Sequence, residues 1–99
     1  MPKLLFTKEA ADRLRELRAD PGLSKRYKAV KGALDKMRAN LRHPGLHTHE
    51  FHCRPCPHGG KLFEAYAQNR TPTAFRIYWC YAPPPPPDTI MIVQISEHP

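Results

Sequence analysis

The stretch KLFEAYAQNRTPTAFRIYWCY at residues 61–81, followed after a proline tract by DTIMIVQISEHP at residues 88–99, decides the fold. Residues 73–81 have the two-residue period of a strand. From residue 75 the odd positions are apolar or aromatic, and the even positions are Arg76, Tyr78 and Cys80. Because alternate side chains of a strand point to opposite faces, we expect the odd face to pack on helices and Arg76 to lie on the open face.

Two further strands accompany this one. Residues 62–67 alternate and are followed by turn-forming residues at 68–72. Residues 89–96 are rich in β-branched side chains and largely apolar on both faces, as suits a central strand. The alanine and five prolines at 82–87 are expected to form a stiff, extended connection between the last two strands.

The first half of the chain has a helical period. Thr7 can cap a helix over residues 8–18, which the Asp-Pro-Gly sequence at 20–22 ends. Ser24 can cap a second helix over residues 25–41. The apolar residues of the second helix step by three and four and form one stripe, namely Tyr27, Val30, Leu34, Met37 and Leu41.

These elements predict a single α+β domain over residues 1–99. Two N-terminal helices are expected to pack on one side of a twisted antiparallel sheet of about four strands. A chain of 99 residues suffices for one hydrophobic core and not for two.

The net charge of +7 favours an acidic partner such as nucleic acid. No segment approaches the roughly 20 apolar residues that cross a bilayer, and the N-terminus lacks a signal-peptide core, so we expect a cytoplasmic protein without a membrane partner. The basic face of the second helix is either a solvated surface or a track for phosphates. The candidate RNA-binding residues are Lys25, Lys28, Lys31 and Lys36 in the helix, with Lys61 and Arg70 beyond it.

The segment HTHEFHCRPCPHGG at residues 47–60 resembles a metal site, because Cys53, Cys56 and His58 are residue types that zinc prefers. A distant second pair of ligands is missing, so a solvated loop with reduced thiols is favoured over a zinc loop. An odd total of three cysteines argues against a disulfide framework, and Cys80 is interpreted as a small core residue. Neither a metal nor another cofactor is expected.

Arg76 and His98 are the remaining candidates for chemistry. Cleavage of RNA by its own 2′-hydroxyl needs a base, a cation for the developing phosphorane charge and an acid for the 5′-oxygen. Arginine suits the second role and histidine the third. Alternatively, Arg76 forms a surface ion pair with Glu64 across the hairpin, and His98 is a frayed chain end. The polar residues expected around them are Lys61, Glu64, Tyr66, Tyr78, His47, His49 and Glu50.

The order of these segments resembles the RelE/ParE toxin superfamily of bacterial toxin–antitoxin systems. Two helices are followed by HPGL at 43–46, GKLFEAY at 60–66, AFRIYW at 74–79 and IMIVQISEHP at 90–99. The resemblance implies two helices on a twisted antiparallel sheet. It further implies a ribosome-dependent mRNA endonuclease that a cognate antitoxin neutralises in a hetero-oligomer, with the ribosome and mRNA as partners.

The resemblance also assigns roles to residues. Arg76 matches the strand arginine that contacts the scissile phosphate, and His98 matches a C-terminal histidine that serves as general acid. The same branch uses a glutamate as general base before the second strand, and Glu50 is the candidate here, with His47 and His49 close by. Two rival functions remain open. One is a ParE-like toxin that binds DNA gyrase without cleaving RNA, and the other is a basic nucleic-acid-binding module with a zinc loop.

Overall fold

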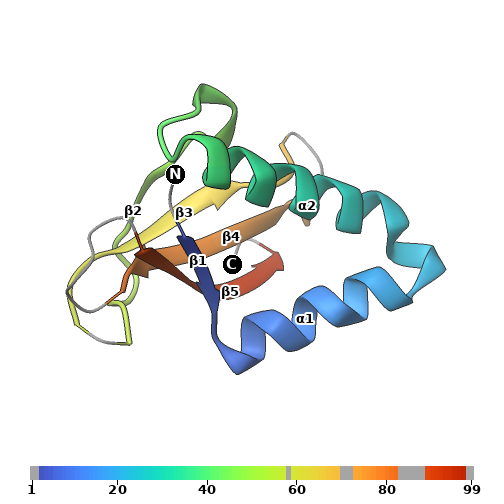
Figure 1. The fold of residues 1–99 in the computed structure, drawn as a ribbon, viewed down its shortest axis with the longest axis horizontal. Coiled ribbons are helices and arrows are strands. Elements are labelled where there is room, and N and C mark those ends of the chain that lie inside the picture. The colour runs from blue at the N-terminus through green and yellow to red at the C-terminus, as the bar shows by residue number, and fades with distance from the viewer. Residues whose placement is uncertain (1–2, 58, 70–72, 83–88, 98–99) are drawn as a thin grey trace.

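The computed structural model describes residues 3–57, 59–69, 73–82 and 89–97, which form two α-helices and a five-stranded sheet (Figure 1). The order along the chain is β1 (Lys3–Phe6), α1 (Lys8–Ala19), α2 (Ser24–Ala39), β2 (His49–Phe51), β3 (Leu62–Tyr66), β4 (Phe75–Tyr81) and β5 (Thr89–Glu97). The α+β class and the two packed helices are therefore confirmed. No helix in these residues is long and apolar enough to cross a membrane.

The sheet differs from the prediction in its strand number and in the direction of one strand. The order across the sheet is β1-β5-β4-β3-β2, and β1 runs parallel to β5 while the other pairs are antiparallel. The expectation of about four antiparallel strands was wrong, because β1 and β2 are too short to produce a periodic pattern. A four-residue segment such as β1 becomes a strand only because the edge of β5 offers it hydrogen-bond partners.

The helix boundaries were predicted with one correct cap and one wrong cap. Thr7 caps α1, since its hydroxyl accepts a hydrogen bond from the Ala10 amide at 3.2 Å, and it also donates to the Val93 carbonyl at 2.9 Å. Ser24 does not cap α2 but is its first residue. The preceding turn is capped by Asp20, whose carboxylate accepts from the Gly22 amide at 2.8 Å.

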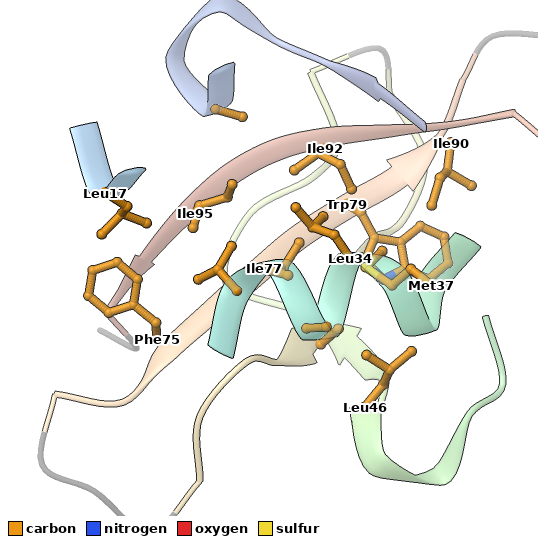
Figure 2. Close-up of a cluster of buried hydrophobic side chains, with 14 residues drawn as sticks. Leu17, Leu34, Met37, Leu46, Phe75, Ile77, Trp79, Ile90, Ile92 and Ile95 are labelled. Atoms are coloured by element: carbon orange, nitrogen blue, oxygen red, sulfur yellow. The ribbon is translucent and has the colours of Figure 1, made fainter. Parts of the chain in front are cut away.

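The main core lies between the helices and the sheet, as Figure 2 shows. The odd residues of β4 point into it, with Phe75 and Ile77 fully buried and Trp79 almost so. They pack against α2 residues such as Leu34 and Met37. The alternation in β4 therefore identified the face that packs on the helices, and this prediction is confirmed.

The opposite face of the sheet is not open, contrary to expectation. Tyr78 and Cys80 are each 1% exposed and belong to a second apolar cluster with Cys56, Leu62 and Val93. The loop between β2 and β3 folds back over β4 and places Cys56 against this cluster. The strand pattern of β4 showed which side chains share the face but not that a distant loop covers it.

A disulfide joins Cys56 in that loop to Cys80 in β4. The expectation of reduced thiols was therefore wrong for Cys56 and Cys80. Cys80 is a small core residue, as interpreted, and is also disulfide-bonded. The zinc-loop alternative loses Cys56 as a ligand in this state, and His58 lies outside the described residues. Cys53 is a free, exposed thiol. An odd cysteine count excludes only the pairing of every cysteine, so it could not exclude one bridge.

Candidate functional site

One row of side chains crosses four strands on the sheet face opposite the helices. His49 of β2 is paired with Glu64 of β3. Glu64 is paired in turn with Tyr78 of β4, and Tyr78 with Gln94 of β5. Directly paired residues of neighbouring strands present their side chains on the same face, so the four form one line.

Glu64 is the centre of this row. Its side chain is 1% exposed, and burying a carboxylate is costly unless donors surround it. Tyr78 donates its hydroxyl to Glu64 Oε2 at 3.0 Å, and His49 Nε2 lies 2.6 Å from Oε1. The Arg76 Nε atom lies 3.9 Å from Oε2. The carboxylate is therefore held in one position by groups from both of its neighbouring strands.

Tyr78 acts as a donor because its hydroxyl stays protonated. Burial raises the pKa of Tyr78 above its ordinary value, and the negative charge and hydrogen bond of Glu64 raise this pKa further. The nearby positive charge of Arg76 opposes this effect but does not cancel it. The hydrogen bond from Tyr78 to Glu64 thus persists well into the alkaline range.

The raised pKa of Tyr78 has a consequence for stability. A group whose pKa is higher in the folded state contributes stability below its unfolded pKa, about 10 for tyrosine, and this contribution is lost as pH rises further. We expect the free energy of unfolding to fall above about pH 10, and Tyr78→Phe to flatten part of that fall. The tyrosinate absorbance of the folded variant should also lack the last-ionising component of the wild type. An alkaline stability profile that Tyr78→Phe leaves unchanged would contradict the prediction.

Arg76 is 8% exposed and makes contacts within the protein. Its guanidinium carbon lies 3.7 Å from the centre of the Tyr66 ring, and Nη1 donates to the carbonyl oxygens of Gln68 and Phe75. Its buried Nε has no hydrogen-bond partner among the described residues and lies near Glu64. The ion pair with Glu64, which was the alternative interpretation of this arginine, is therefore present. The prediction that Arg76 is on an open surface was wrong.

His49 is the most accessible ionisable member of the cluster, with its side chain 48% exposed. Its Nδ1 lies 2.8 Å from the His47 carbonyl oxygen, and its Nε2 faces the carboxylate of Glu64. Both nitrogens thus face acceptors, and the imidazolium form, which has two N–H donors, makes both hydrogen bonds at once. The rings of His47 and His49 also contact Tyr66, with ring centres 5.1 and 5.9 Å away.

Glu50 does not join this cluster. It is paired with Phe63, which packs against the helix-side core, so its side chain leaves the sheet on the face opposite Arg76. Its carboxylate lies 3.8 Å from Lys61 Nζ and 3.5 Å from His52 Nδ1. The structure therefore does not bring Glu50 and Arg76 together.

The predicted RNA-binding lysines are exposed, but they do not surround Arg76. The four helical lysines belong to α2, which covers the other side of the sheet. Lys31 pairs with Asp35 at 3.1 Å within the helix. Arg70 and the proposed general acid, His98, lie outside the described residues.

The sequence named the members of this cluster but not their arrangement. Glu64 and Tyr66 are two residues apart in one strand, as are Arg76 and Tyr78 in the next. That spacing was a usable signal that each pair shares a face. His49 could not be added in the same way, because β2 is only three residues long.

The arrangement provides two functions that acid–base chemistry on an anionic substrate requires. A half-exposed imidazole is oriented by a buried carboxylate. A permanently charged guanidinium lies behind that carboxylate and keeps positive charge in the site. The cluster can therefore accept a proton at His49 while a second cation is held close by.

The fold and the cluster define an α+β protein with a histidine–glutamate–arginine group on the sheet face away from its helices. The chain matches no family model, no curated protein and no solved structure at a significant level. The function is therefore argued from the residues and their geometry.

Proposed function

We propose that this protein is a RelE/ParE-type toxin that cleaves mRNA in the ribosome and is neutralised by a cognate antitoxin in a hetero-oligomer. The observation that carries the proposal is the 2.6 Å contact between His49 Nε2 and the buried Glu64, with Arg76 next to that carboxylate. Two helices packed on one face of a sheet also agree with what the sequence resemblance implies.

In the proposed reaction His49 replaces Glu50 as general base. In the neutral imidazole Nε2 keeps its proton on Glu64, while Nδ1 turns away from the His47 carbonyl oxygen and takes the proton of the RNA 2′-hydroxyl. The 2′-oxygen then attacks the adjacent phosphorus. The bond from phosphorus to the 5′-oxygen then breaks, and a 2′,3′-cyclic phosphate and a 5′-hydroxyl form. Glu64 stabilises the resulting imidazolium, as the carboxylate does in a catalytic triad. His98 remains the proposed acid that protonates the departing oxygen.

Arg76 contributes positive charge in this account. Its guanidinium is stacked on Tyr66 and largely buried, so its field acts through a medium of low dielectric constant, where it is stronger than in water. The field opposes the negative charge of Glu64 and lowers the cost of bringing a phosphate to His49. Direct contact with the phosphate requires the guanidinium to turn away from Gln68.

The exposed lysines of α2 have a separate role in the proposal. They lie on the other layer of the molecule from His49, so they are suited to contacts with ribosomal RNA and not with the scissile phosphate. Such contacts are electrostatic and independent of sequence. Lys31 is partly neutralised by Asp35, so Lys25, Lys28 and Lys36 carry most of this charge.

Expression in bacterial cells tests the proposal. We expect growth arrest and new 5′ ends in mRNA by primer extension, and both should disappear with Arg76→Ala. Arg15→Ala is the matched control, because Arg15 is an exposed arginine of α1 paired with Asp12. Growth arrest with intact mRNA and damaged DNA would contradict the nuclease and support a gyrase-binding toxin. The antitoxin should suppress the arrest and co-purify with the protein.

A further inference from the structure

A pocket of about 500 Å³ lies between the segment that follows α2 and the neighbouring strands β3 and β4. One part of its lining is aromatic, with Phe63, Trp79 and Tyr81, and another is polar, with Arg42 and two histidines. Its size is in the range of sites that hold small molecules. Trp79 and Phe63 belong to the helix-side core, so this pocket lies on the other side of the sheet from Glu64. Its lining residue His47 also contacts the cluster, through Tyr66 and His49.

The aromatic lining leaves one ring available to a ligand. Phe63 stacks on Trp79 with ring centres 4.8 Å apart, and Tyr81 meets both edge-on. Trp79 is 2% exposed, but Tyr81 is 50% exposed and is one of only two large apolar side chains exposed in the described residues. An exposed aromatic ring fixed by two others is a stacking surface for a planar group.

The part of the lining with Arg42 and the histidines has hydrogen-bond donors that suit an anion. The Gly45 amide donates to His43 Nδ1 at 2.9 Å, so the neutral ring carries its proton on Nε2, which can donate to a ligand. A Cβ built on Gly45 would lie 3.2 Å from Lys36 Nζ, which places that ammonium at the same turn. Arg42 has no side-chain partner within the described part of the chain, and none of the described lining residues is acidic.

Trp79, which lines the pocket, has a buried hydrogen-bond donor that no described residue accepts. Its indole Nε1 is buried and has no hydrogen-bond partner among the described residues. Figure 2 shows its ring at the end of the core beside Met37 and Ile90. A buried donor left unpaired is destabilising. Because Nε1 has no accessible surface, a ligand in the pocket meets the ring of Trp79 and not this atom.

We propose that this pocket binds a nucleoside 5′-phosphate, either free or as an unpaired nucleotide of RNA. The base stacks on Tyr81, and the phosphate lies at Arg42 and His43. Stacking and phosphate contacts together select a nucleotide over a simple anion or a simple aromatic compound. The proposal does not depend on RNA cleavage, because none of these residues belongs to the His49 cluster.

Trp79 is the only tryptophan of the chain, so its fluorescence reports on the pocket directly. We expect adenosine 5′-monophosphate to change that fluorescence in a saturable way. Ribose 5-phosphate, which lacks the base, and adenosine, which lacks the phosphate, should bind at least tenfold more weakly. Arg42→Gln and Tyr81→Ala should each weaken binding by tenfold or more, while Tyr81→Phe retains it.

Arg54→Gln is the matched control, since Arg54 donates to Gln94 on the other face of the sheet. Binding of a short single-stranded oligonucleotide but not of the mononucleotide, with the same dependence on Arg42, would support RNA as the source of the nucleotide. Three results would overturn the proposal. The first is no fluorescence change with adenosine 5′-monophosphate or with the oligonucleotide. The second is equal affinity for ribose 5-phosphate and adenosine 5′-monophosphate. The third is an affinity for the nucleotide that Arg42→Gln and Tyr81→Ala leave unchanged.

Discussion

Replacing His49 with alanine is expected to lower the rate of RNA cleavage by about 10²–10⁴-fold, the usual contribution of a general acid–base group. The fold should survive, because the side chain is half exposed and lies on a three-residue edge strand. Single-turnover cleavage of mRNA bound to programmed ribosomes measures this loss. Binding to the ribosome should stay within a few-fold of wild type.

Two variants sharpen the interpretation of that loss. His52→Ala is the matched control, since His52 is an exposed histidine near Glu50 and should leave cleavage unchanged. Glu64→Gln removes the carboxylate that holds His49 Nε2, so it should lower the cleavage rate. Equal rates for His49→Ala and wild type would show that His49 is not the base.

Reduction of the Cys56–Cys80 disulfide is expected to lower the free energy of unfolding by about 3 kcal/mol. The two cysteines are 24 residues apart in the sequence, so the bridge restricts a sizeable loop of the unfolded chain. Reduction also frees the β2–β3 loop from the apolar cluster on β4. Urea denaturation with and without reductant measures the difference.

Cys53→Ser is the control for this experiment, because Cys53 is exposed and unpaired. It should keep both the wild-type stability and its response to reductant, whereas Cys80→Ala should lose that response. Thiol titration of the unfolded, unreduced protein should find one free thiol. Three free thiols, or a urea midpoint that reductant does not change, would contradict the disulfide. In a reducing compartment glutathione acts on such a bond, so the reduced stability is then the relevant one.

The parts of the fold that the sequence predicted are those with a long local pattern. The alternation in β4 identified the helix-side residues Phe75 and Ile77, and Thr7 identified the start of α1. β1 was missed because four residues carry too little periodicity, and its pairing depends on β5 at the other end of the chain. Its parallel direction makes the sheet mixed, which no local pattern indicates.

The site was predicted in its residue types but not in its environment. Spacing alone suggested that Glu64 and Arg76 could pair across the β3–β4 hairpin, and they do. The burial of Arg76 could not be inferred, because it depends on Tyr66 and on the carbonyl of Gln68. The position of Glu50 depends on the register of a three-residue strand, and a shift of one residue would reverse its face.

The most direct test of RNA cleavage through His49 is chemical analysis of the RNA ends produced by the purified protein on programmed ribosomes. Attack by the 2′-hydroxyl predicts a 2′,3′-cyclic phosphate on the upstream fragment and a 5′-hydroxyl on the downstream fragment. Both should be lost with His49→Ala and kept with His52→Ala. Intact mRNA under conditions where the protein stops growth, or ends that form at the wild-type rate in His49→Ala, would contradict cleavage through His49.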